Sequence, residues 1–378
     1  MLTWTQSLRE HGQAFLGWLQ QESVLLRRGR IVAEAVRQIL HQRVTTPEDA
    51  HAVWAATPSV LQRCNEQSTY ADRFAPVAYA WLHLLDRYAR TWRALEQLVE
   101  AHILSLGKEG VRTLDIGTGP GPSALAIADF YSALSLFADE KKIARLKQPC
   151  SVDCIEYDRG TNDFRHHLAE VIYSKDRAYS KAVLSLCWAM PDFGRVNPAE
   201  QRRDMRRSLL ATEDRVWDPI DGVWTWEPRH TPSEANDASQ ASLRYRLFVF
   251  SNFLTNLGTV AKFEPNISSL LTDAHAGSVV VVLGGKGQEY PDIYRYVNRL
   301  AAAAGFDVVI QDVAVSASNT SLETLVFEEG RSFYKYLQLL SRDQSSELSS
   351  VHQHFSSLQR AKDPSSHVRA YRKQRSAR

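Results

Sequence analysis

The first 108 residues carry apolar side chains at three- and four-residue steps, as a helix buried on one face requires. Thr46, followed by a proline and two acids, is a helix start: a hydroxyl cap, then negative charge at the positive end of the helix dipole. A longer helix is predicted over 76–106, ended by Gly107. These patterns predict a helical N-terminal region over 1–108.

From residue 111 the pattern changes to short β-branched runs that alternate with helical stretches. The runs fall at 111–116, 152–156, 182–187, 247–251, 278–283, 306–310 and 323–327. Strands alternating with helices form crossover units and a mainly parallel sheet with helices on both faces. We therefore predict an α/β domain over 109–330, built on a seven-stranded, mainly parallel, doubly wound sheet.

Two segments fall outside this alternation. Residues 191–243 are rich in Arg, Pro, Asp and Trp without a steady period, and a structureless loop of that length is uncommon. We expect this insertion to be a functional lid or a small subdomain. Residues 331–378 form a basic C-terminal extension, with ten Lys and Arg against three Asp and Glu. Its part at 333–340 has a helical pattern, and its end, YRKQRSAR, is expected to be mobile.

Composition places the chain among ordinary globular proteins. Its 378 residues are 44% hydrophobic and 23% charged, with a net charge of +2, which excludes disordered, collagen-like and disulfide-scaffold classes. No run approaches the roughly 18 apolar residues of a membrane span, and the start lacks the pattern of a secretory signal. Four cysteines indicate a reducing compartment, so we expect a cytoplasmic protein. Cys150 and Cys154 have no second pair at zinc spacing, so no metal site is expected.

The most informative stretch runs from an apolar strand into a helix through a glycine-rich turn. The strand ends in Asp115, then Gly117, Gly119 and Gly121 stand at alternate positions, and a helix begins at Pro122. Glycines let the backbone turn tightly and let a ligand approach main-chain atoms, while the helix start presents unpaired N–H groups. In an open parallel sheet, a nucleotide-like ligand binds at such a turn.

Two common nucleotide signatures do not fit this turn. A dinucleotide fingerprint needs glycine at the sixth position from Gly117, where Pro122 stands, and a phosphate loop needs a Gly-Lys-Ser/Thr ending. What remains is Asp-x-Gly-x-Gly-x-Gly after the first strand. In this motif the chain resembles the class I S-adenosylmethionine-dependent methyltransferases, and the likeness extends over about 111–328.

The resemblance implies S-adenosylmethionine as the cofactor and gives roles to particular residues. The glycine turn, with Thr118 inside it, would lie against the methionine part, and Asp115 would work near the amino group. A carboxylate after the second strand would accept both ribose hydroxyls, which an ionised acid does best. Glu156 is the first choice for this role and Asp158 the second.

The third and fourth strands are expected to complete the site. After the third strand, Asp192 would face the adenine amino group and Trp188 or Met190 would pack on the adenine ring; equally, these could be core residues leading into the insertion. Ser251 and Asn252 end the fourth strand, where the resembling family faces the transferable methyl, and they are the catalytic candidates. Asn252 could orient an acceptor nitrogen, or it could cap the following turn.

The acceptor stays open between several classes. The absence of cysteine at 251–256 argues against methylation of a pyrimidine carbon. Arginines next to tryptophans in the insertion suit a phosphate backbone with stacked bases, although a solvated helix face fits them equally well. These are Arg202, Arg203, Arg206 and Arg207. The leading hypothesis is a methyltransferase of RNA or another nucleic acid, helped by the basic tail. The alternatives are a small-molecule methyltransferase with a helical lid or homo-oligomer interface, and a non-catalytic cofactor-binding scaffold that acts through a partner protein.

Overall fold

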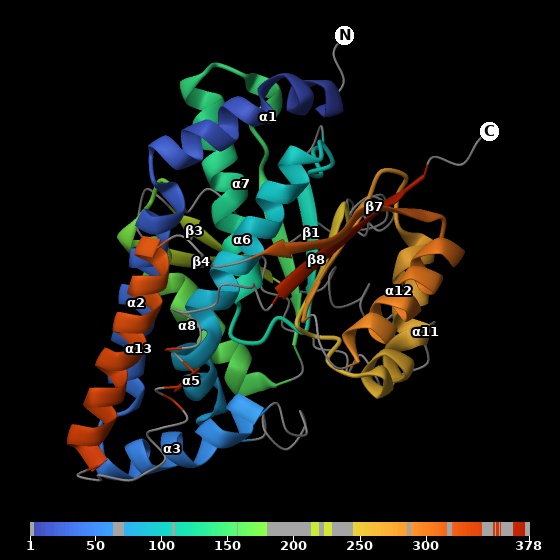
Figure 1. The fold of residues 1–378 in the computed structure, drawn as a ribbon. Coiled ribbons are helices and arrows are strands. Elements are labelled where there is room, and N and C mark those ends of the chain that lie inside the picture. Colours follow the sequence, from blue (N-terminus) through green and yellow to red (C-terminus); the bar gives the residue numbers. More distant parts are fainter. Residues whose placement is uncertain are drawn as a thin grey trace.

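Figure 1 shows the fold of the chain in a computed structural model. The structure describes residues 4–62, 72–107, 110–156, 158–179, 213–218, 223–228, 245–285, 289–315, 320–341, 351, 353–354, 356 and 366–374. Within these ranges, a six-stranded sheet carries helices on both faces, and the N-terminal helices extend the helical layer on one of them.

The N-terminal region is helical, as its apolar spacing predicts. Its helices are α1 Trp4–Gln21, α2 Val24–Arg43, α3 Pro47–Gln62, α5 Ala75–Tyr79, the π-helical turn η1 Ala80–Leu84 and α6 Leu85–Glu100. The predicted start of α3 is confirmed. The Asp49 amide donates to Thr46 Oγ1 at 3.1 Å, and the Asp49 carboxylate accepts from the Thr46 amide at 3.1 Å, so the two residues cap each other.

The helix predicted over 76–106 ends earlier than expected. Its last helical residue is Glu100, because His102 adopts a left-handed φ of 55°. The amides of residues 103 and 104 then both donate to the Leu98 carbonyl, which closes the helix. Gly107 therefore lies beyond the helix end, in the connection to the first strand.

The sheet has the order β2-β1-β5-β6-β8-β7. Its strands are β1 Val111–Ile116, β2 Cys150–Ile155, β5 Leu247–Ser251, β6 Val279–Gly284, β7 Phe306–Val315 and β8 Ser366–Lys373. The first four strands in this order pair in parallel, while β8 pairs antiparallel with both β6 and β7. An α/β fold is confirmed, with a mixed sheet of six strands in the described part of the chain. The strand predicted at 182–187 lies outside the described residues.

The strand predicted at 323–327 is wrong, because these residues lie in α13, Thr320–Ser341. The buried apolar side chains of α13 recur at helical rather than strand spacing, and they pack against α2 and α3. They include Leu322, Val326, Phe333 and Leu337. The helical pattern recognised at 333–340 is the second half of the same helix.

The expectation of a mobile C-terminal end is wrong for residues 371–373, which belong to β8. Tyr371 is fully buried between the sheet and the helices on one face. The basic side chains of this strand are engaged within the fold. Arg369 donates to both carboxylate oxygens of Asp312, at 2.7 and 2.6 Å, and Lys373 donates to two backbone carbonyls at the end of the helix before β6.

Consecutive residues of the central strands face two different hydrophobic cores. The helices that cover the sheet are α7 Pro122–Glu140, the short 3-10 turn η2 Ala144–Leu146, α8 Arg159–Lys175, α11 Leu257–Asp273 and α12 Tyr290–Ala303. Val249 and Val281 face the core shared with α7, α8 and the N-terminal helices, whereas Phe250 and Val282 face α11 and α12. Figure 1 shows these two helical layers on opposite sides of the strands.

Two further strands lie in the insertion. β3 Glu213–Asp218 and β4 Val223–Pro228 pair antiparallel as a separate two-stranded sheet. The rest of 191–243 lies outside the described residues, so the function of this segment stays a prediction.

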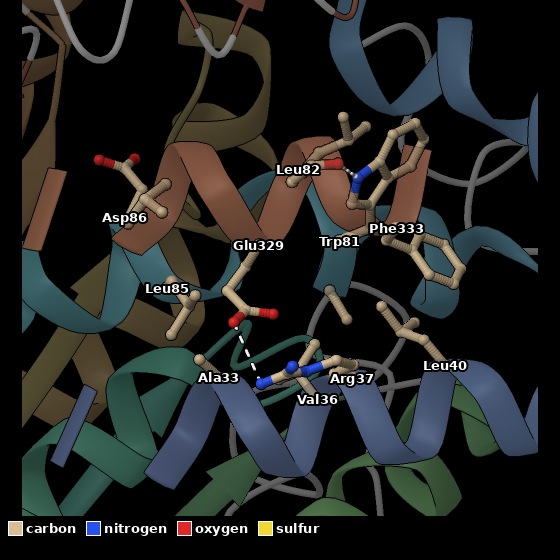
Figure 2. Close-up of a pocket in the computed structure, with 13 residues that line it drawn as sticks. Ala33, Val36, Arg37, Leu40, Trp81, Leu82, Leu85, Asp86, Glu329 and Phe333 are labelled. Atoms are coloured by element: carbon tan, nitrogen blue, oxygen red, sulfur yellow. Dashed lines mark hydrogen bonds and ion pairs between the residues drawn. The ribbon is translucent and has the colours of Figure 1, made fainter. Parts of the chain in front are cut away.

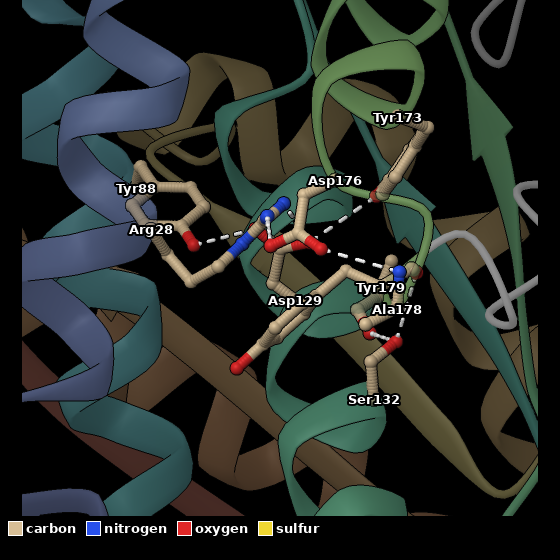
Figure 3. Close-up of polar contacts among 9 residues, drawn as sticks. Arg28, Tyr88, Asp129, Ser132, Tyr173, Asp176, Ala178 and Tyr179 are labelled. Carbon is tan, nitrogen blue, oxygen red and sulfur yellow. Dashed lines mark hydrogen bonds and ion pairs between the residues drawn. The ribbon is translucent and has the colours of Figure 1, made fainter. Parts of the chain in front are cut away.

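A buried ion pair joins the N-terminal helices to α7 (Figure 3). Arg28 of α2 donates to both carboxylate oxygens of Asp129 at 2.9 Å, and the Tyr88 hydroxyl donates to the same carboxylate at 2.7 Å. Arg28 also donates to Asp176 at 3.0 Å and lies over the Tyr179 ring. Burial alone lowers the pKa of Arg28, but the Asp129 charge raises it and the net shift is upward. The charged pair therefore fixes α2 and α6 against the helical layer of the sheet.

Candidate functional site

The carboxyl ends of three strands meet where the strand order of the sheet reverses. β1 lies between β2 and β5. The connection after β1 leads to β2 on one side, and the chain later returns to β5 on the other side. Ligands of open α/β sheets bind in the crevice outside the strand ends at such a point. The turn 117–121 follows β1, Glu156 follows β2 and Ser251 ends β5, so candidates from three strands converge here.

All three glycines of the turn have left-handed backbone conformations. Their φ angles are 68° at Gly117, 55° at Gly119 and 95° at Gly121, where a residue with a Cβ would be strained. The amides of Gly117 and Thr118 donate to the Ile155 carbonyl at 2.9 and 3.1 Å. The turn is thereby tied to the end of β2.

The space beside each glycine differs. A Cβ at Gly117 would lie 2.2 Å from the Phe253 ring, and one at Gly121 would lie 2.7 Å from the Arg165 side chain. A Cβ at Gly119 would meet no atom of the described residues within 4 Å. Among the described residues, nothing covers the Cα of Gly119, whereas the Phe253 ring covers Gly117.

Asp115 and Thr118 support the turn from beneath. The Asp115 carboxylate is fully buried and accepts from the Ser123 hydroxyl at 2.5 Å and from the Thr118 hydroxyl. Burial raises the pKa of Asp115, and these two hydrogen bonds oppose the rise. The backbone amide of Ala124, in the first turn of α7, also lowers the pKa of this carboxylate. Arg165 of α8 donates to the Gly119 carbonyl at 3.2 Å and holds the turn from the same side.

Glu156 and Asp158 have different positions. Glu156 is 8% exposed; its Oε2 accepts from the Gly119 amide at 2.9 Å and its Oε1 from the Asp158 amide at 3.2 Å. Asp158 is the N-cap of α8, and its carboxylate accepts from the Thr161 amide at 2.6 Å. Glu156 therefore lies against Gly119, whereas the Asp158 side chain caps α8.

The end of β5 brings Ser251 and Asn252 together. Asn252 has a left-handed φ of 56°, and its Nδ2 donates to Ser251 Oγ at 3.2 Å. The Asn252 Oδ1 accepts a hydrogen bond from Arg87 of α6. The capping alternative falls to Asn256 instead, whose side chain accepts from an amide in the first turn of α11 at 2.8 Å. Asn tolerates this left-handed conformation better than most residues, and four other non-glycine residues of the described part also adopt it.

Sequence reasoning missed three side chains at this site: Arg87, Phe253 and Arg165. Arg87 stands within the predicted N-terminal helix, where a buried charge would be the signal, but the sequence does not show which helical positions are buried. Phe253 directly follows Ser251 and Asn252, and the sequence does not distinguish an aromatic residue of the site from one of the core. Arg165 carried no signal, because its role depends on α8 folding back under the turn.

Other candidates lie outside the described residues. These are Trp188, Met190, Asp192, Arg202, Arg203, Arg206 and Arg207. Cys150 and Cys154 are buried thiols of β2, where burial raises the pKa of each to about 12. The described residues contain no group of three or more potential metal ligands. Of the helices in the described ranges, none combines the length and apolarity required to cross a bilayer.

A separate small hollow lies between α2, η1 and α13 (Figure 2). Arg37 of α2 and Glu329 of α13 pair across it at 3.2 Å, and the Trp81 indole donates to the Gly330 carbonyl at 2.9 Å. It has room for about one water molecule. None of its lining residues belongs to the strand ends, so it is not part of the candidate site.

No family model matches the sequence, and no curated protein matches it either. Solved structures are similar in fold. One is a phosphoethanolamine N-methyltransferase 2 of Haemonchus contortus with phosphomonomethylethanolamine and S-adenosylhomocysteine: identity 14%, coverage 84% of this chain and 59% of that chain, TM-score 0.39. Another is a S-adenosylmethionine-dependent methyltransferase of Geobacter sulfurreducens with S-adenosylhomocysteine, at 12% identity, 75% and 91% coverage and a TM-score of 0.35.

A third similar structure is the [4+2]-cyclase SpnF, at 12% identity, 75% and 81% coverage and a TM-score of 0.37. The match to the Haemonchus contortus protein spans only 59% of that protein's length. Similarity at this level assigns no activity.

Proposed function

We propose that this protein is an S-adenosylmethionine-dependent methyltransferase. The observation that carries the proposal is the open backbone at Gly119, beside the Glu156 carboxylate, at the reversal point of the sheet. An adenosyl ligand needs close access to main-chain atoms and an ionised acceptor for its ribose hydroxyls. Both lie together here, on the motif that resembles this class of enzymes.

The residues around the turn fit such a cofactor. Glu156 accepts from the Gly119 and Asp158 amides, and because each carboxylate oxygen can accept more than one hydrogen bond, Glu156 can also accept ribose hydroxyls. Asp115, whose buried carboxylate holds the turn through the Thr118 and Ser123 hydroxyls, would be the acid near the amino group of the cofactor. The Phe253 ring covers Gly117, so it has to turn away for a ligand to lie along the whole turn.

S-adenosylmethionine, when bound, supplies an already activated methyl group. The work left to the chain is to hold an acceptor in line and to exclude water. Ser251 and Asn252 lie beside the turn at the end of β5, with α6 reaching them through Arg87. Asn252 Oδ1 can accept an N–H or O–H of an acceptor and so fix the direction of its lone pair.

For the acceptor, we favour a small molecule over a nucleic acid. Two basic residues of the tail, Arg369 and Lys373, are engaged within the fold by Asp312 and by backbone carbonyls, so they do not form a free basic track. Arg87 of α6 also reaches the end of β5, so a helix of the N-terminal region contributes to the acceptor side, as the small-molecule alternative requires.

Calorimetric titration with S-adenosylhomocysteine tests the cofactor class, with ATP and NAD as controls. We expect saturable binding of S-adenosylhomocysteine alone. Binding of ATP or NAD without S-adenosylhomocysteine would contradict the proposal. Incubation with methyl-labelled S-adenosylmethionine and separated cell fractions then tests turnover: label in small molecules supports the enzyme proposed here, label in RNA restores the nucleic-acid hypothesis, and binding without transfer favours a scaffold.

A further inference from the structure

Arg87 differs from the other arginines on the same helix. Arg90 pairs with Asp86 at 2.9 Å and Arg93 pairs with Glu96 at 2.6 Å. Among the residues that the structure describes, no carboxylate oxygen lies within 4.0 Å of an Arg87 nitrogen. Its hydrogen bond goes to the neutral amide oxygen of Asn252. Within the described residues, Arg87 is therefore the arginine of α6 without an ion-pair partner, and its hydrogen bond reaches the candidate site.

Arg87 is also largely removed from water, with 7% of its surface exposed. A buried guanidinium is costly unless it is paired, because the loss of hydration has to be offset by an anion and by hydrogen bonds. Its planar fork matches the two oxygens of a carboxylate or phosphate. A single amide oxygen accepts from only one of the N–H groups that a guanidinium can donate.

We propose that Arg87 is a specificity residue that binds an anionic group of the methyl acceptor, making the substrate a small carboxylate- or phosphate-bearing molecule. The inference rests on the proposed function. The contact with Asn252 puts the guanidinium next to the residue expected to face the transferable methyl. An oxyanion bound to the Arg87 nitrogens other than the one that donates to Asn252 would thus hold the acceptor beside Asn252.

The position of Arg87 favours the acceptor over two other anions. The methionine part of the cofactor would lie along the glycine turn after β1, whereas Arg87 contacts Asn252 after β5. A nucleic-acid backbone needs a row of accessible cations, whereas Arg87 is enclosed and its helix neighbours are already paired. A small acid can enter where a polymer cannot.

The test uses the full chain and four proteins: wild type, Arg87→Gln, Arg87→Lys and the control Arg93→Gln, which alters a paired arginine of the same helix. Each is incubated with methyl-labelled S-adenosylmethionine and a metabolite fraction divided by anion exchange into acidic and non-acidic molecules, with RNA as a third arm. Phosphatase treatment of the labelled product distinguishes a phosphate from a carboxylate. Calorimetry with S-adenosylhomocysteine and thermal melts accompany each protein.

We expect label in the acidic small-molecule fraction with wild type and with Arg93→Gln. Arg87→Gln should lower this rate at subsaturating acceptor by about tenfold or more, with Arg87→Lys intermediate, while S-adenosylhomocysteine affinity stays within about twofold. Label in the non-acidic or RNA arm overturns the inference. It is also overturned if folded Arg87→Gln loses as much affinity for S-adenosylhomocysteine as it loses transfer rate. Cofactor binding without an acidic product also overturns it, whereas absence of cofactor binding by wild type overturns the proposed function itself.

Discussion

Replacing Gly119 by alanine separates a ligand-binding role of the glycine turn from a folding role. The added methyl meets no described atom within 4 Å, so it creates no clash with that part of the ligand-free protein. Its folding cost comes from the left-handed φ of 55°, about 1–2 kcal/mol for a residue with a Cβ. A cofactor lying against the bare backbone would collide with the same methyl. Overpacking of this kind costs about 1–3 kcal/mol, so affinity for S-adenosylhomocysteine should fall about 5- to 150-fold.

Gly277 offers a matched control for this substitution. It has a left-handed φ of 85°, no described atom within 4 Å of an added Cβ, and a place in the turn between α11 and β6. Gly277→Ala should lose a similar amount of stability and keep full affinity. Thermal melts measure the first quantity and calorimetric titration the second. Wild-type affinity in Gly119→Ala would refute the assignment of the turn, and a loss in both variants would mean that strain rather than contact is responsible.

Four further substitutions test other parts of the site and the fold. Glu156→Gln should weaken S-adenosylhomocysteine about tenfold in calorimetry, because an ionised acceptor is lost, and unchanged affinity would remove the ribose role. Asp158→Ala should cost about 1 kcal/mol in urea unfolding through the lost helix cap, with no effect on affinity; a large affinity loss would move the ribose role to Asp158. Phe253→Ala should speed association of S-adenosylhomocysteine in stopped-flow measurements, since the ring no longer covers the turn, and slower association would show that the ring helps binding. Arg28→Met should destabilise the protein by about 3–5 kcal/mol in urea unfolding, because Asp129 is left buried without its cation, and a loss below about 1 kcal/mol would contradict that reading.

Local patterns predicted the part of the fold that local chemistry determines. The strands 111–116 and 247–251 were placed with their observed limits, because glycine or a polar residue stands directly before and after each run. The glycine spacing likewise anticipated a turn that needs left-handed backbone at all three glycines. Glu156 could be preferred to Asp158 as the candidate ribose acceptor because Glu156 directly follows a buried strand.

Pairing between strands that lie far apart in the sequence could not be predicted from local patterns. β8 comes from the C-terminal end of the chain and inserts between β6 and β7, so its strand character depends on partners far away in sequence. The apolar run at 323–327 was taken for a strand because a short run does not distinguish a strand from one buried face of a helix. Arg87 was missed for a related reason: its importance comes from its contact with Asn252, 165 positions later in the chain.

A crystal structure with S-adenosylhomocysteine tests the central claim most directly. We expect the methionine part along the turn at Gly117 and Gly119, both ribose hydroxyls on the Glu156 carboxylate, and the Phe253 ring turned away from its present contact. A ligand bound elsewhere, with Phe253 still packed on Gly117 and Glu156 bonded only to backbone amides, would contradict the account.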